Sequence, residues 1–105
     1  MERFAWKGRI KPGMRADYKR RHDEIWPEML ALLKDAGIRN YTIWSDGETL
    51  FGYYECERGI AFAEQAQAGS PVVDRWNAYM EDVLELEMDP ATGAQPKMTC
   101  MFLME

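Results

Sequence analysis

The stretch that decides the fold is "RNYTIWSDGETLFGYYECE", residues 39–57. Its first part, residues 39–44, is rich in aromatic and β-branched side chains, which favours a β-strand. The Asp46-Gly47 pair that follows is typical of a tight hairpin turn, and residues 49–57 then have the pattern of the returning strand. We therefore expect an antiparallel hairpin in the middle of the chain.

A further strand is expected near the start of the chain, in "FAWKGRI". Alternation places Phe4, Trp6 and Ile10 on one face, while Ala5 and its polar neighbours lie on the other. The "KPG" that follows ends this strand. We therefore expect a half-buried strand that precedes the first helix.

A helical run is predicted from about Met14 to Ala36, between this strand and the hairpin. Gly37 stands at the position of a helix C-cap glycine. Pro27 interrupts the run, because proline has no N–H to donate to the preceding turn. We therefore expect the helix to kink or restart near Trp26.

After the hairpin, the sequence predicts two more helices and a final strand. A short helix covers residues 60–67, and another begins at "GSP", with Ser70 as N-cap and Pro71 in the first helical position. Residues 87–97 have the composition of a polar loop. The closing "MTCMFLM", residues 98–104, is expected to form the last strand.

The resulting order is β-α-β-β-α-β within a single domain, residues 1–105. This order predicts an α+β protein of the ferredoxin-like class, with two helical segments on one face of an antiparallel sheet. Residues 49–57 and 98–104 each carry large apolar side chains on both faces. Because the helices cover only one face, we expect a homodimer that packs sheet against sheet. The alternative is a monomer that uses these side chains to line a ligand cleft.

Composition excludes several classes of function. The chain has 105 residues and a net charge of −5, which disfavours binding to a nucleic-acid backbone. No apolar stretch is long enough for a membrane span, and no secretory signal is recognisable, so we expect a cytoplasmic protein. Cys56 and Cys100 are isolated, and the chain has one histidine. The sequence therefore points to no metal site and no cofactor.

The one histidine, His22, falls on the inward face of the first helical run. At 100° per residue it shares a narrow arc with Tyr18, one turn earlier, and with a set of apolar residues: Ile25, Met29, Leu32 and Ala36. A lone inward histidine is either a hydrogen-bonded structural residue or a proton-transfer group, and periodicity alone slightly favours the structural role. The chain also has many aromatic side chains for its size, which suit the binding of a small polyol such as a sugar.

Three groups of residues give the chain a resemblance to a known family. The block "YKRRHDEIWPEM", residues 18–29, the pair Asn40-Tyr41 and the "RW…YM" of residues 75–80 resemble the L-rhamnose mutarotases. The likeness extends over nearly the whole chain. It implies a dimeric α/β-barrel fold without cofactor or metal. The implied activity is that of an isomerase, which interconverts the α and β anomers of a 6-deoxy sugar.

By position in this family, His22 would be the proton donor, and Tyr18, Tyr41 and Trp76 would contact the sugar. Residue 77 would complete the pocket. Many members of the family carry a second tryptophan there, whereas this chain has Asn77. The C-terminal residues also depart from the family pattern. The implied substrate is therefore L-rhamnose, with L-fucose or another aldose as the alternative.

Mutarotation opens and recloses a hemiacetal ring, so it requires one proton to be delivered to the ring oxygen and another to leave the C1 hydroxyl. Histidine, with a reference pKa of about 6.5, is suited to such transfers. We expect His22 to donate to the ring oxygen and Tyr18 to orient the sugar or relay a proton, while the base is unassigned. Two other functions stay open: a non-catalytic dimer that binds a small ligand, and a cofactor-free oxygenase, by analogy of fold alone.

Overall fold

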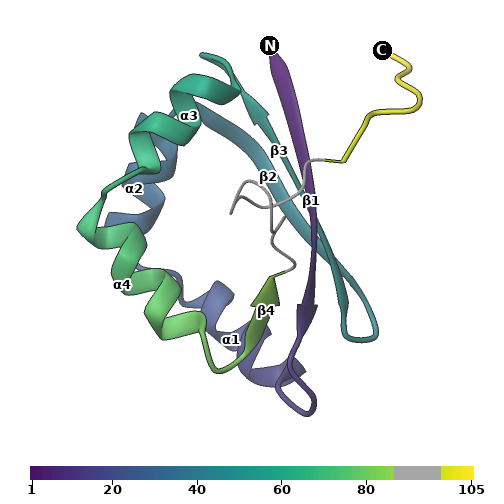
Figure 1. The fold of residues 1–105 in the computed structure, drawn as a ribbon, viewed down its shortest axis with the longest axis vertical. Coiled ribbons are helices and arrows are strands. Elements are labelled where there is room, and N and C mark those ends of the chain that lie inside the picture. The colour runs from purple at the N-terminus through teal and green to yellow at the C-terminus, as the bar shows by residue number, and fades with distance from the viewer. Residues whose placement is uncertain (87–97) are drawn as a thin grey trace, which may run out of the picture.

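The computed structural model describes residues 1–86 and 98–105. Along the chain, two helices follow the first strand, two consecutive strands come next, and two more helices precede the last strand (Figure 1). In chain order they are β1 (Glu2–Ile10), α1 (Arg15–Asp23), α2 (Pro27–Asp35), β2 (Ile38–Asp46), β3 (Thr49–Cys56), α3 (Ile60–Gln67), α4 (Pro71–Met80) and β4 (Leu84–Leu86).

The four strands form one sheet in the order β2-β3-β1-β4, and all neighbouring strands are antiparallel. Figure 1 shows that the helices gather on one side of this sheet and leave its other face bare. Below, the inner face is the one that the helices cover, and the outer face is the bare one. The predicted α+β, ferredoxin-like arrangement is confirmed.

The central hairpin is confirmed, with β2 paired to β3 from Ile38 opposite Cys56 to Asp46 opposite Thr49. Gly47 has φ +59°, as a tight turn between twisted strands requires. The pairing is irregular near the start of β2, where Asn40 and Tyr41 together lie opposite one residue of β3. Such a β-bulge redirects a side chain, and the one at stake is Tyr41.

The helical run over residues 14–36 is divided in two, as Pro27 led us to expect. The first helix, α1, ends at Asp23, and α2 begins at Pro27 with Trp26 in the N-cap position. Proline is tolerated at this first position because its missing N–H would have no intrahelical partner anyway. Gly37 follows α2 with φ +79°, which confirms the predicted C-cap glycine.

The last two helices begin where the sequence predicts. The Ser70 side chain accepts a hydrogen bond from the N–H of Val73 at 3.5 Å and so caps α4. The N-terminus of α3 has Gly59 as N-cap, and the carboxylate of Glu2 accepts a bond from the N–H of Ile60 at 2.8 Å. This contact ties the start of β1 to the start of α3.

The predicted last strand is wrong. Residues 98–104 are not in a strand, and the fourth strand is Leu84–Leu86, which pairs with Gly8 to Ile10 of β1 directly after α4. The C-terminal residues keep one contact with the sheet, in which the N–H of Met98 donates to the carbonyl of Ala5 at 3.0 Å. Strand propensity reports only a suitable side-chain pattern, and a strand also needs an unpaired neighbour to bond. The polar loop expected over residues 87–97 lies outside the described residues.

The core lies between the inner face of the sheet and the helices. Leu50, Tyr54 and Cys56 of β3 are buried there, whereas Phe51 on the outer face is 38% exposed. The expected division of β3 into two apolar faces is therefore confirmed. Among residues 1–86 and 98–105, no helix is long and apolar enough to cross a membrane.

Candidate functional site

A cavity of about 1080 Å³ lies on the inner face of the sheet, between the strands and the helices. It brings together all five residues that the family resemblance implied, from three different elements: Tyr18, His22, Tyr41, Trp76 and Asn77. Most other lining side chains are apolar, such as Ile10, Leu50 and Val73. An apolar cavity with a few convergent polar groups is the usual form of a small-molecule site.

His22 lies in the last turn of α1, with its ring held in a defined orientation. Its Nδ1 atom is 3.2 Å from the backbone carbonyl oxygen of Tyr18. Because a carbonyl oxygen only accepts hydrogen bonds, Nδ1 carries the hydrogen, and Nε2 of the neutral ring keeps a free lone pair. Burial lowers the pKa of His22 below its ordinary value, against smaller opposing effects of the Tyr18 carbonyl and Asp23. At neutral pH the imidazole is therefore uncharged and can accept a proton at Nε2.

Aromatic rings enclose this imidazole. The Tyr18 ring stacks on it at a centroid distance of 4.3 Å, and Trp76 of α4 meets it edge to face at 5.5 Å. Trp26 packs in turn against Trp76 at 5.2 Å. The enclosure explains why burial dominates the pKa of His22, since little water reaches the charged form.

Two buried hydroxyl groups accompany His22. Tyr18 is 6% exposed, and burial, together with the nearby Tyr41, raises its pKa. Tyr41 is 37% exposed over the whole residue, but its hydroxyl lies inside, and burial raises its pKa to about 12. Both tyrosines are therefore neutral at pH 7 and can donate or accept hydrogen bonds in the cavity.

The two remaining residues of the predicted site come from α4. Trp76 is 8% exposed and presents an apolar ring to the cavity. Asn77 is exposed and lies at the rim, where it adds an amide with both donor and acceptor capacity. This part of the rim is therefore polar.

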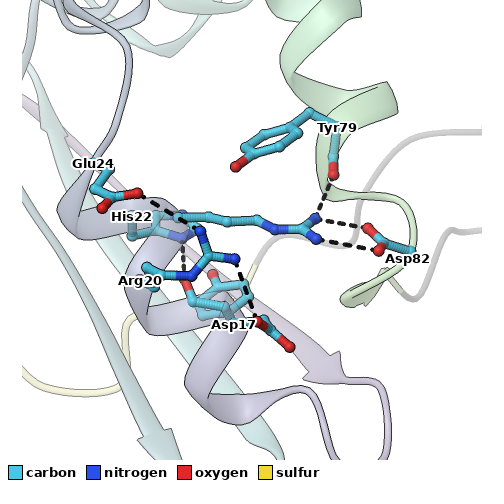
Figure 2. A network of polar contacts seen from close by, with 8 residues as sticks. Asp17, Arg20, His22, Glu24, Tyr79 and Asp82 are labelled. Carbon is cyan, nitrogen blue, oxygen red and sulfur yellow. Dashed lines mark hydrogen bonds and ion pairs between the residues drawn. The ribbon is translucent and has the colours of Figure 1, made fainter.

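The charged side chains next to His22 in the sequence are exposed and pair with one another. Lys19 pairs with Asp23 at 2.6 Å. Arg20 approaches Asp17 at 3.3 Å and Glu24 at 3.7 Å (Figure 2). All five side chains are well exposed, and such pairs contribute little to stability. Lys19 and Asp23 also line the cavity, whereas Asp17, Arg20 and Glu24 do not.

Arg21, in contrast, has a largely buried side chain, and no pattern in the sequence indicated its role. Its side chain is 12% exposed and binds both carboxylate oxygens of Asp82, at 2.7 and 3.2 Å (Figure 2). It also donates to the carbonyl of Tyr79 at 2.6 Å. These bonds tie the last turn of α1, which carries His22, to the end of α4, which carries Trp76.

Sequence reasoning also missed Trp6, which it placed only among the strand residues of the core. The indole lines the cavity, and its Nε1–H donates to the hydroxyl of Tyr41 at 3.1 Å. Tyr54 likewise lines the cavity next to Tyr41, with their ring centroids 4.9 Å apart. The inward face of β1, visible in the alternation, was the one available signal for Trp6.

Ligands for a metal ion do not gather in the part of the chain that the structure describes. No group of three or more histidine, cysteine or acidic side chains lies close enough there to hold an ion. Cys56 is buried and Cys100 is exposed, and neither forms a disulfide. The polar groups that line the cavity are the His22 imidazole, tyrosine and serine hydroxyls, the amides of Gln67 and Asn77, and the charged side chains of Arg15, Lys19 and Asp23.

Comparison with known proteins identifies close relatives along the whole chain. The family model for L-rhamnose mutarotase matches residues 3–104. A protein named L-rhamnose mutarotase from Mesorhizobium japonicum is 45% identical over 97 residues, which cover 90% of each chain. Another of the same name, from Sinorhizobium fredii, is 41% identical over 105 residues, 98% of this chain and 99% of that one.

A solved structure agrees with these sequence relatives. The crystal structure of an L-rhamnose mutarotase from Formosa agariphila covers 100% of both chains, with a TM-score of 0.80 and 31% sequence identity. The family model, the sequence relatives and the shared fold thus carry the same name. The chain belongs to the L-rhamnose mutarotase family.

Proposed function

We propose that this protein is an isomerase that interconverts the α and β anomers of L-rhamnose. The observation that carries the proposal is the uncharged imidazole of His22, which faces an aromatic-lined cavity together with two neutral tyrosine hydroxyls. Such groups move protons without a nucleophile or a redox centre. The relatives that bear the name L-rhamnose mutarotase support the same reaction.

His22 is the catalytic acid–base group of this proposal. Because its Nδ1–H is engaged by the Tyr18 carbonyl, Nε2 accepts the proton of the C1 hydroxyl as the C1–O bond to the ring oxygen breaks. The ring oxygen takes a proton from a tyrosine hydroxyl in the cavity and becomes the C5 hydroxyl, and that tyrosine is left as a phenolate beside the imidazolium. After rotation about C1–C2, closure reverses these transfers, and the imidazolium returns its proton to the carbonyl oxygen. His22 is thus a proton acceptor in opening and a donor in closing, instead of the donor to the ring oxygen that the sequence led us to expect, because burial lowers its pKa and leaves the imidazole neutral.

The other four residues bind and orient the sugar. Trp76 offers a flat apolar ring for the C–H face of the pyranose, while the hydroxyls of Tyr18 and Tyr41 bond its oxygens. Asn77 contributes an amide at the rim. The methyl group of a 6-deoxy sugar suits the apolar lining, to which the buried Met29 contributes.

We further propose that two copies of the chain form a homodimer through their outer faces. Phe51 and Trp44, neighbours in the register of the sheet, are 38% and 69% exposed, and an apolar patch of this kind favours burial against a partner. The C-terminal segment is also apolar and exposed, with Phe102 at 81%, and it leaves the body on the side away from the helices (Figure 1). A second copy covers both features.

The proposed setting is the cytoplasm, with a small sugar as the ligand and neither nucleic acid nor membrane as a partner. Cys56 and Cys100 form no disulfide in the structure, which fits a reducing compartment. The net charge of −5 disfavours association with anionic polymers and lipid surfaces.

Saturation-transfer NMR on an equilibrium mixture of sugar anomers tests the proposed reaction. We expect the protein to accelerate anomer exchange of L-rhamnose strongly, that of L-fucose less, and that of D-glucose least. Stronger acceleration of L-fucose would move the substrate to another 6-deoxy sugar. If L-rhamnose binds but no sugar exchanges faster than in buffer, the protein is a binding module instead, and the proposal fails.

A further inference from the structure

We propose that Trp6 is a positioning residue for the reaction, because its indole holds the Tyr41 hydroxyl so that the phenol proton points into the cavity. The inference deepens the proposed function and rests on it. It assigns to Trp6 a role that neither the sequence pattern nor its place in the core revealed.

In the hydrogen bond between Trp6 and Tyr41, the indole is the donor. An indole nitrogen only donates hydrogen bonds, so in the 3.1 Å contact between Trp6 Nε1 and Tyr41 Oη the tyrosine oxygen is the acceptor. The hydroxyl proton of Tyr41 must therefore point away from the indole. No contact among the described residues gives this proton a protein acceptor, and the hydroxyl faces the cavity. Trp6 thus orients Tyr41 as a donor toward whatever occupies the cavity.

The Trp6 indole is held in place by the sheet on which it packs. It is 5% exposed and lies flat across the sheet, over glycines on β1 and β3. A Cβ atom at Gly52 would overlap the indole ring, and one at Gly8 would lie 3.1 Å from Cζ3. Because glycine has no side chain, these two positions leave room for the indole ring against the sheet. Its N–H is therefore fixed by the sheet itself.

Tyr41 needs a hydrogen-bond partner because the packing of its ring does not orient its hydroxyl group. It lies on the edge strand β2, beside the bulge at which Asn40 has φ +52°, a conformation that few residues other than glycine adopt. Its ring packs against Tyr54 at 4.9 Å, and the residue is 37% exposed. Packing on one side leaves the hydroxyl free to rotate, and the bond from Trp6 removes that freedom.

An oriented Tyr41 hydroxyl provides the hydrogen-bond donor that ring opening requires. The ring oxygen of a pyranose carries no hydrogen, so it only accepts hydrogen bonds, and it gains charge as the ring opens. His22 is set as an acceptor at Nε2, and it needs a complementary donor across the sugar. A Tyr41 proton directed into the cavity supplies it. The donor is worth most when the ring oxygen carries charge, so Trp6 acts mainly on kcat.

A double-mutant cycle on the anomer exchange rate tests the assignment. Tyr41→Phe should lower kcat about 10- to 100-fold, because it removes a bond to an oxygen that gains charge. Trp6→Phe, which keeps an aromatic ring but removes the N–H, should lower kcat about 3- to 10-fold with little change in KM. In the Tyr41→Phe background, Trp6→Phe should have no further effect on kcat. If the two losses multiply, Trp6 acts only through the stability of the core, and the proposal is overturned.

A matched control separates positioning from general destabilisation. Val83 is fully buried but is not among the residues that line the cavity. We expect Val83→Ala to lower the free energy of unfolding without lowering kcat in either background. A loss of kcat in Val83→Ala that also vanishes in the Tyr41→Phe background would show that any core change produces the coupling, and would overturn the proposal.

The hydrogen bond can also be observed without any catalysis, in ¹H–¹⁵N NMR spectra of the tryptophan indoles. Tyr41→Phe removes the acceptor, so the indole proton of Trp6 should move upfield, while that of the exposed Trp44 stays in place. An unchanged Trp6 signal would overturn the proposal even if Trp6→Phe fails to fold. A protein that shows the shift but accelerates no sugar exchange would sink the proposed function while keeping the contact.

Discussion

Tyr53 and Tyr54 are neighbours on β3, yet they lie on opposite faces of the sheet and in different chemical surroundings. Tyr54 points inward, is 8% exposed, stacks on Phe4 at 4.9 Å and lines the cavity. Tyr53 points outward, and its hydroxyl donates to the carboxylate of Glu55 at 2.8 Å. The same residue type therefore contributes to a proposed sugar site on one face and to a surface hydrogen bond on the other.

The comparison shows that aromatic content alone does not identify a binding site. Both faces carry aromatic rings, but the cavity described above and the His22 imidazole lie on the inner face. There the helices exclude water, which lowers the pKa of His22 and keeps Tyr41 neutral. The outer face offers exposed apolar surface, which suits a protein partner better than a small polar ligand.

The largest expected effect on the inner face is the loss of kcat when the His22 imidazole is removed. His22→Gln keeps a side chain of similar reach but cannot change its charge, so we expect kcat to fall about 10²–10⁴-fold. Anomer exchange of L-rhamnose by NMR is the measurement, and binding of the sugar should persist. A control at Arg20→Gln, in exposed ion pairs of the same helix and outside the cavity lining, should leave kcat within about twofold. Wild-type activity in His22→Gln would remove His22 from the mechanism.

The next largest effect should be a loss of stability when the space beneath the Trp6 indole, which lines the cavity, is filled. Gly52→Ala places a methyl group where the Trp6 indole lies, so we expect the free energy of unfolding to fall by about 1–3 kcal/mol. Urea unfolding measures this change. Lys7→Ala, on the outer face of the adjacent strand, should change it by less than about 0.5 kcal/mol. Equal effects of the two substitutions would mean that the indole is free to move aside.

The outer face can be tested by adding a charge to it. Phe51→Glu places a carboxylate on the proposed dimer interface, so we expect the dimer to dissociate at least about tenfold more readily, since an unpaired charge there opposes burial. Analytical ultracentrifugation across a range of concentrations measures the association. The exposed Glu64 of α3, on the opposite side of the sheet, provides a control as Glu64→Gln. A wild-type protein that stays monomeric at high concentration would refute the interface directly.

The pH dependence of catalysis follows from the state of His22. Burial holds its pKa below 6.5, so the imidazole is neutral at pH 7 and becomes charged only as the pH falls through this lowered pKa. Because the neutral form accepts the first proton, kcat should be flat at neutral pH and should fall about tenfold per unit below that pKa. A profile that instead falls as the pH rises through this pKa would assign the protonated form to ring opening.

Much of the fold could be predicted because its signals are local. The Asp46-Gly47 turn, the break before Pro27 and the cap at Ser70 each depend on a few adjacent residues, and each was found where the pattern indicated. The fourth strand was misplaced because pairing with β1 depends on residues far apart in the chain. The apolar run at residues 98–104 has the composition of a strand without an assigned neighbour in the same chain.

The residues of the site were likewise predictable only where they lie close together in the sequence or match the family pattern. Tyr18 and His22 are one helical turn apart, so periodicity alone placed them together, and the family resemblance added Tyr41 from elsewhere in the chain. The bond from Trp6 to Tyr41 spans 35 residues of sequence, and the one from Arg21 to Asp82 spans 61. Contacts of such separation leave no periodic signal, so only the folded chain reveals them.

The central claim is that the sugar binds on the inner face, and the tyrosines provide an internal test of it. In a protein labelled with ¹³C at the tyrosine ring carbon bonded to the hydroxyl, L-rhamnose should shift the signals of Tyr18, Tyr41 and Tyr54. The signal of Tyr53, on the outer face, should stay where it is. A shift of Tyr53 with the three inner signals unchanged would place the sugar on the bare face and contradict the claim.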